Sequence, residues 1–380
     1  MQVVIRWLLA GLVWLVLLEA GAWMALRLRP EWRTAPVTWS QAECFEHADW
    51  VEDYFAEWWS LQLRWEPYVY WRSRAFHGRY IEVGENGFRT TWNPEERGGQ
   101  DVVRIHLFGG STLWGLGARD HHTIPSLVSQ WMSKHLDRPV EVVNCGELGY
   151  VNTQELVLLI KALQKGQTPD VAVFYDGVND VFSAYQSGVS GIPQNEYRRE
   201  KEFNLLSTQG DRTAFLAAAA VYHVFRKSAA VRLASRFLAR STPGMEKELE
   251  PAEAERLAAG VHSTYVQNVD MIQALADRMG FRAMYYWQPT VFTKPLRSPH
   301  ESEQYRQYQS LQRITALANR HVAQCDRLSA LEHFHDIAAI YEDHPEGLFF
   351  DYCHTGERGN AIIAERMARD IHALLMQQIP

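Results

Sequence analysis

The larger, C-terminal part of the chain alternates between short apolar runs and longer amphipathic stretches. The runs are rich in Val, Ile and Phe and end in Gly or a polar residue, which is typical of buried strands. The amphipathic stretches repeat apolar residues every three or four positions, which predicts helices that cover a sheet. We expect strands at 102–110, 140–146, 170–177, 281–289 and 327–336, and helices at 123–136, 152–166, 262–280 and 359–378. This alternation predicts an α/β fold with a mostly parallel sheet.

Two regions depart from this alternation. Residues 183–261 contain an alanine-rich stretch at 213–240 and then a strongly charged one, and we expect a helical insertion here. Four basic residues interrupt the alanine-rich stretch, which argues against a membrane span within it. Residues 29–100 are rich in Trp and Tyr and predict an N-terminal extension that packs on the following domain. The expected organisation is an anchor at 1–28, this extension, and a main domain at 101–380.

The first 28 residues contain a long apolar stretch. Residues 7–26 carry one charge, Glu19, and a helix over them would reach about 30 Å, the thickness of a bilayer's hydrocarbon core. We therefore expect an uncleaved single-pass transmembrane anchor. A cleaved signal peptide is the alternative, because Ala20-Gly21-Ala22 matches the small-residue pattern of a cleavage site. The basic residues that follow, Arg27 and Arg29 among them, would by themselves favour a cytoplasmic main domain.

Composition and charge narrow the classes of partner. The 380 residues carry a formal net charge of −7 and no long basic run, so we do not expect nucleic acid as a partner. The four cysteines have no Cys-x-x-Cys spacing, which indicates neither a zinc knuckle nor a redox pair; one disulfide stays open as an alternative to free thiols. His333 and His335 alternate near Asp336, but no further ligands at metal-like spacing accompany them. We expect no metal and no cofactor.

Four polar motifs follow expected strands or precede the last helix. Ser111 lies in FGGSTLWG, Gly149 in NCGELGYVNT and Asn179 in FYDGVNDV. Asp351 and His354 stand three residues apart in FFDYCHTG. Each motif taken alone also has an ordinary interpretation, such as a helix N-cap for the serine or a turn for the asparagine. Because ligands of doubly wound sheets bind outside the carboxyl ends of the strands, we expect the motifs to meet at one edge.

Taken together, the four motifs resemble the SGNH branch of the GDSL esterase/lipase superfamily over about residues 102–375, apart from the insertion. The resemblance implies a flavodoxin-like three-layer α/β/α sandwich. It implies Ser111 as nucleophile, His354 as base and Asp351 as the partner that orients the base. The Ser111 N–H, the Gly149 N–H and the Asn179 side-chain amide would form the oxyanion hole. The usual Gly-Asp-Ser of the family reads Gly-Gly-Ser here, and the missing Asp is not a catalytic member.

The function that this resemblance implies is a membrane-anchored serine esterase that hydrolyses an O-acyl ester. The chemistry agrees with the residue types, since a serine hydroxyl is a poor nucleophile until an imidazole accepts its proton. One alternative is an O-acyltransferase that uses the same triad to modify an envelope glycan or a lipid. Another is a catalytically idle binding protein on the same fold. The resemblance and the tryptophan-rich extension favour the extracytoplasmic side of a bacterial inner membrane, with an acylated glycan or lipid as substrate.

Overall fold

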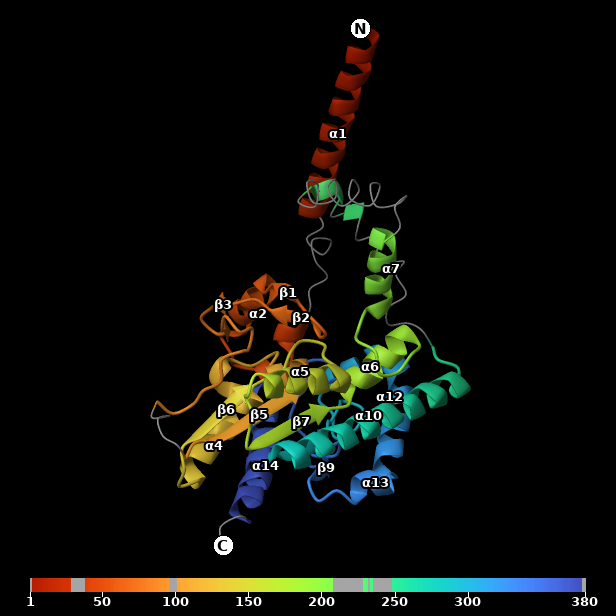
Figure 1. The fold of residues 1–380 in the computed structure, drawn as a ribbon. Coiled ribbons are helices and arrows are strands. Elements are labelled where there is room, and N and C mark those ends of the chain that lie inside the picture. Colours follow the sequence, from red (N-terminus) through yellow and green to blue (C-terminus); the bar gives the residue numbers. More distant parts are fainter. Residues whose placement is uncertain are drawn as a thin grey trace. The chain divides into compact units, whose positions relative to one another are not determined.

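The computed structural model describes residues 2–28, 38–95, 101–207, 228–231, 233–234 and 248–377 (Figure 1). The chain divides into two compact units. The main unit comprises Trp39–Asn195 and Glu248–Pro380, and the small unit comprises Met1–Thr38 and Glu196–Lys247.

The main unit is built on a five-stranded parallel sheet in the order β6-β5-β7-β8-β9. Its strands are β5 (Val103–Gly109), β6 (Val140–Asn144), β7 (Val171–Asp176), β8 (Arg282–Trp287) and β9 (Phe334–Asp336). Numbered along the chain, this is the 2-1-3-4-5 order of flavodoxin-like doubly wound sheets. The prediction of a parallel sheet is confirmed. The last strand is shorter than predicted, because its first half forms the short helix α13 (Asp326–Ser329).

Helices cover both faces of the sheet, so the main unit has three layers (Figure 1). One face packs against α5 (Asn152–Gln164), α6 (Val178–Ser187), α10 (Pro251–Met279) and α12 (Gln309–Ala323). The other packs against α4 (Ile124–His135) and α14 (Glu357–Met376). In β7, Ala172 and Phe174 enter the first core cluster while Val171, Val173 and Tyr175 enter the second. This is the period of two that a strand buried on both faces requires.

The aromatic-rich segment before the sheet forms a separate layer of small elements. These are η2 (Thr38–Gln41), η3 (Glu43–Phe45), α2 (Val51–Ser60) and the antiparallel pairs β1 (Leu63–Glu66) with β2 (Tyr70–Ser73) and β3 (Phe76–His77) with β4 (Glu82–Val83). Its buried residues share one apolar cluster with Trp114 and Phe350 of the sheet-containing region. Buried Arg89 donates to the carbonyls of Gly115 (2.7 Å) and Ala118 (2.6 Å), which fixes the turn just after Ser111.

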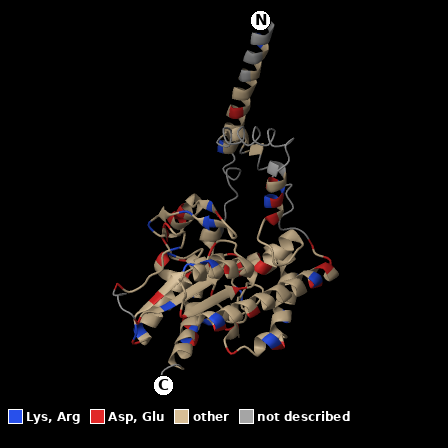
Figure 2. Cartoon of the chain, in the orientation of Figure 1, with Lys and Arg blue, Asp and Glu red and all other residues tan. Residues whose placement is uncertain are grey.

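The remaining elements of the main unit lie in loops at the ends of the strands. They are α3 (Ser111–Trp114), η4 (Asp120–His122) and α11 (Pro299–Gln307). Lys294 and Glu301 form an ion pair with both side chains fully buried, and Glu301 also accepts from the backbone N–H groups of Leu348 and Phe349. This pair ties α11 to the segment that leads into the Asp351–His354 motif. Figure 2 shows both signs of charge on the outer helices.

The small unit contains α1 (Gln2–Leu28) and α7 (Glu196–Ser207). Ala22 and Leu26 of α1 pack against Ala229, and the Glu19 carboxylate accepts from the backbone N–H groups of Ala229 (2.6 Å) and Ala230 (3.1 Å). Among the helices in the described ranges, none is both long and apolar enough to cross a membrane, so the expected transmembrane anchor is not supported. The alanine-rich helix expected at 213–240 falls almost entirely outside the described residues.

Candidate active site

Ser111 is the first residue of the one-turn helix α3, directly after β5. Gly110 occupies the N-cap position in an extended conformation, so the serine hydroxyl does not cap the helix. Instead, the Ser111 Oγ lies 2.7 Å from the Nε2 atom of His354. The ordinary N-cap interpretation of this serine is therefore wrong, and its hydroxyl is directed at an imidazole from a loop 243 residues later.

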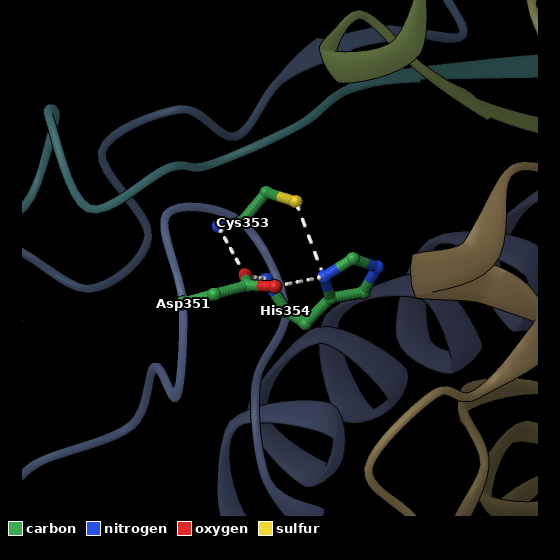
Figure 3. A group of neighbouring side chains, drawn as sticks. All are labelled: Asp351, Cys353 and His354. Atoms are coloured by element: carbon green, nitrogen blue, oxygen red, sulfur yellow. Dashed lines mark hydrogen bonds and ion pairs between the residues drawn. The ribbon is translucent and has the colours of Figure 1, made fainter. Parts of the chain in front are cut away.

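The imidazole of His354 is held between the serine and a carboxylate. Its Nδ1 atom lies 2.7 Å from Asp351 Oδ2, as drawn in Figure 3. The chain of contacts Asp351–His354–Ser111 matches the geometry in which a carboxylate fixes the tautomer that leaves Nε2 free to accept a proton. Ser111 and His354 are each 9% exposed, whereas Asp351 is 3% exposed. The serine end of this series of contacts is therefore nearer to solvent than the carboxylate end.

The Asp351 carboxylate is stabilised in its charged form. Burial acts to raise the pKa of Asp351, but the charge of His354 and hydrogen bonds from the backbone N–H groups of Cys353 and His354 bring the pKa below its ordinary value. These two backbone bonds, 2.9 and 2.7 Å long, occupy Oδ1 and leave Oδ2 for the imidazole. The carboxylate therefore accepts from His354 throughout the neutral pH range.

The ring of His354 is also held by packing. It stacks on Phe350 with ring centroids 5.6 Å apart and an interplanar angle of 17°. Phe350 in turn contacts Trp39 and Phe45 of the aromatic layer, with centroids at 5.5 and 5.3 Å. The His300 Nε2 atom lies 2.8 Å from the Phe350 carbonyl. The aromatic layer thereby supports the position of the imidazole.

Cys353 lies against the same imidazole, with its Sγ atom 3.4 Å from His354 Nδ1 (Figure 3). Ligand atoms of Asp351, Cys353 and His354 all lie within 4.8 Å of one another, so the cluster could in principle hold a metal. A metal would need the thiolate and a free Nδ1. Burial and the neighbouring Asp351 raise the pKa of the thiol well above its ordinary value, and Nδ1 is already paired with the carboxylate. The arrangement therefore fits proton transfer better than metal binding.

Asn179 lies beside the serine loop, at the start of α6. A Cβ atom placed on Gly110 would be 1.9 Å from Asn179 Nδ2, so this amide nitrogen lies directly against the residue before Ser111. Nδ2 donates one hydrogen bond to the Tyr150 carbonyl, at 2.8 Å, and a side-chain amide has a second N–H to offer. Asn179 Oδ1 accepts from Gln194 Nε2 at 3.1 Å.

Gly149 precedes Tyr150 in the loop after β6. Its φ of +73° is a left-handed conformation that glycine adopts without strain. A Cβ atom placed on Gly149 would be 3.0 Å from Gln194 Oε1, so this glycine also lies close to the side chain that bonds Asn179. The structure thus brings the predicted triad residues together, and it brings Asn179 and Gly149 together through Tyr150 and Gln194.

A group of buried carboxyls beneath this loop was not anticipated from the sequence. Asp176 accepts from Asn152 Nδ2 at 2.9 Å, and Asp180 accepts from the Asn152 backbone N–H at 3.1 Å. Glu155 lies close enough to Asp176 for the two carboxyls to influence each other's pKa, whereas Glu155 Oε2 and Asp176 Oδ1 are buried without a hydrogen-bond partner among the described residues. Burial raises the pKa of Asp176 to about 8, that of Asp180 to about 6 and that of Glu155 well above its ordinary value. The sequence offered one signal for this group, which was the position of Glu155 on the apolar side of the helix predicted at 152–166.

Three other side chains of the sheet-containing region are buried: Trp114, Gln288 and His106. Trp114 is buried under the Arg89 guanidinium, whose carbon lies 4.4 Å from the ring centroid. Gln288 donates to Thr112 Oγ1 and to the Tyr175 carbonyl. It also borders a small pocket with Gly177 and Tyr352, whose volume of about 10 Å³ is room for about one water molecule. The third side chain, His106, lines a cavity of about 550 Å³ near β5 and β6.

No family model and no curated protein matches this chain. Among solved structures, it is similar to the lipase Lip_vut3 from a goat rumen metagenome, with 13% identity, a TM-score of 0.41, and coverage of 70% of this chain and 97% of that chain. It is also similar to the acetyl xylan esterase AlAXEase, with 13% identity, a TM-score of 0.37 and coverage of 70% and 98%. A member of the lipolytic protein G-D-S-L family from Veillonella parvula shows 11% identity, a TM-score of 0.35 and coverage of 70% and 97%. At these identities and TM-scores, the likenesses do not identify a function.

Proposed function

We propose that this chain is a serine hydrolase that cleaves an acyl ester. The observation that supports the proposal most directly is the unbroken chain from the Asp351 carboxylate through the His354 imidazole to the Ser111 hydroxyl, with both contacts at 2.7 Å. A carboxylate, an imidazole and a hydroxyl hydrogen-bonded in this order seldom occur by chance. They lie at the carboxyl ends of a doubly wound sheet, where such folds bind ligands.

In the proposed reaction, Ser111 Oγ attacks the ester carbonyl while His354 Nε2 accepts the hydroxyl proton. The carbonyl oxygen becomes the anion of a tetrahedral intermediate. When the intermediate collapses, the bond to the alkoxide breaks and His354 returns the proton to that leaving oxygen, which leaves an acyl ester on Ser111. Water then attacks the acyl carbon, again with His354 as base, and releases the acid. Asp351 keeps Nδ1 protonated and offsets the positive charge of the imidazolium.

The developing oxyanion would be stabilised by the Ser111 N–H, the Gly149 N–H and the second N–H of the Asn179 amide. Preorganised donors of this kind are worth about 10²–10³ in turnover each. Asn179 is neutral, so its donation does not depend on pH. The position of its Nδ2 against Gly110 supports this role, since the residue before the nucleophile lies next to the reacting carbon.

An acyltransferase would use the same residues and pass the acyl group to a sugar or lipid hydroxyl in place of water. The two are distinguished by the product, which is free acid in one case and an acylated acceptor in the other. We propose an O-acylated envelope glycan or lipid as the substrate. We propose the extracytoplasmic side of a bacterial inner membrane as the location. Both proposals rest on the sequence alone. A C-terminal alkaline phosphatase fusion tests the location, because that reporter is active only outside the cytoplasm.

The activity is tested by hydrolysis of p-nitrophenyl acetate, a small activated acyl ester. We expect Ser111→Ala to lose at least about 10³-fold in kcat, since the nucleophile is gone. Ser129→Ala is a matched control, because Ser129 is a fully buried serine that bonds Asn93 on the α4 side of the sheet. Equal activity of wild type and Ser111→Ala would refute the proposal.

A further inference from the structure

Gln194, in the loop that follows α6, lies against two of the residues that carry proposed oxyanion donors, Asn179 and Gly149. Gln194 Nε2 donates to Asn179 Oδ1 at 3.1 Å, and Gln194 Oε1 lies 3.0 Å from where a Cβ atom of Gly149 would be. A single primary amide therefore lies against both the Asn179 side chain and the Gly149 backbone. No sequence motif pointed to this residue, because it lies outside the four polar motifs.

This loop is folded back onto α6 by its own hydrogen bonds. The Asn195 N–H donates to Gln186 Oε1 at 2.8 Å, and Gln186 Nε2 donates to Asn195 Oδ1 at 3.1 Å. The Ser183 hydroxyl donates to the Ile192 carbonyl. Asn195 itself has a φ of 60°, a left-handed conformation that asparagine tolerates better than most residues. The backbone on both sides of Gln194 is thus fixed to the same helix that carries Asn179.

The orientation of the Asn179 amide determines whether it can stabilise an oxyanion. An asparagine amide has nearly the same shape when it is rotated by 180°, but the rotation exchanges two donors for an acceptor. In the observed orientation Nδ2 faces the Tyr150 carbonyl and Gly110, and Oδ1 faces the donor on Gln194. In the rotated orientation Oδ1 would face the Tyr150 carbonyl and the developing negative charge, which is repulsive.

We propose that Gln194 is a positioning residue that holds the Asn179 amide with its N–H groups toward the oxyanion. The inference rests on the proposed function, since it assigns Gln194 to the same site. Gln194 acts only through Asn179 and does not itself take part in the reaction. The hydrogen bond to Oδ1 and the one to Tyr150 together make the productive orientation the only one in which both ends of the Asn179 amide are paired.

The decisive variant is Gln194→Glu, which changes the hydrogen-bonding character with little change in shape. At pH 8 the carboxylate cannot donate to Asn179 Oδ1 and instead attracts Nδ2, which favours the rotated amide. We expect kcat for p-nitrophenyl acetate to fall about 10- to 100-fold with little change in KM. As pH falls to about 4, the range in which a glutamic acid ordinarily titrates, the carboxyl gains a proton and can donate again, so the ratio of variant to wild-type kcat should rise. Taking the ratio at each pH removes the pH effects on kcat that both proteins share.

Two comparisons separate positioning from a general structural role. Gln167→Glu makes the same chemical change at an exposed residue of the α5–β7 loop and should leave the ratio flat with pH. In an Asn179→Ala background, Gln194→Glu should lower kcat by less than about 3-fold, because the amide that Gln194 orients is absent. A ratio that does not change with pH, or an undiminished loss in the Asn179→Ala background, overturns the inference while leaving the hydrolase proposal in place. Absence of hydrolysis by the wild type overturns both.

Discussion

Replacement of Gly110 by alanine tests the oxyanion site through a single methyl group. Gly110 has φ −82° and ψ −154°, a conformation that alanine adopts without strain, so the substitution acts only through the space it fills. The new Cβ atom would lie 1.9 Å from Asn179 Nδ2 and 3.1 Å from its Cγ, whereas ordinary contacts between such atoms are about 3.5 Å.

The Asn179 amide would therefore have to retreat by about 1.5 Å. A retreat of that size lengthens the 2.8 Å bond to the Tyr150 carbonyl beyond hydrogen-bonding range and removes the second N–H from the oxyanion. We expect kcat for p-nitrophenyl acetate to fall about 10²–10³-fold, equivalent to about 3–4 kcal/mol of transition-state stabilisation, with KM nearly unchanged.

The assay is a double-mutant cycle with Asn179→Ala, measured by steady-state hydrolysis and accompanied by thermal melting of each variant. If Gly110→Ala acts by displacing the amide, it should cost less than about 3-fold once Asn179 is alanine, because the clash is gone. The reasoning would be refuted if the losses in kcat of the two single variants multiplied in the double variant. A Gly110→Ala variant that keeps wild-type kcat would also refute it.

Two further predictions concern the triad and the buried carboxyls. Asp351→Asn should lower kcat about 10⁴-fold, because an amide no longer fixes the tautomer of His354, and a loss below 10-fold in steady-state assays would contradict its role. Burial raises the pKa of Asp176 to about 8, so the stability that its protonated form contributes is complete below about pH 4 and is lost as pH rises through about 8. Glu155→Gln removes a second carboxyl whose pKa burial raises well above its ordinary value, so the decrease in unfolding free energy from pH 5 to pH 8, measured in urea, should be smaller than in wild type; an equal decrease would show that this pair does not control it.

Much of the sheet was predictable because its strands are buried on both faces and read as continuous apolar runs. The strand expected at 327–336 was partly wrong, since a short apolar run does not distinguish a strand from a turn of helix, and α13 (Asp326–Ser329) occupies its start. The rule that strand ends converge at one edge accounts for the position of Ser111 after β5, whereas the meeting of Ser111 with His354, which lies in the loop before α14, was implied only by the resemblance of the four motifs.

The polar contacts around the site could not be predicted in the same way. Gln194 reaches Asn179 from a loop without any periodic pattern, and Glu155 meets Asp176 across two elements. Arg89 similarly donates to the carbonyls of Gly115 and Ala118, and its own segment shows only turn residues and aromatics in the sequence. Hydrogen bonds between distant side chains depend on the completed fold and leave no local signature.

The central claim is that Ser111 is a nucleophile activated by His354. The most direct measurement is mass spectrometry of the intact protein and its peptides after treatment with a fluorophosphonate, which reacts covalently with activated serines. We predict one adduct, on Ser111, that is absent in Ser111→Ala and strongly reduced in His354→Ala. An adduct on a different serine, or ester hydrolysis by a protein that takes up no adduct, would contradict the claim.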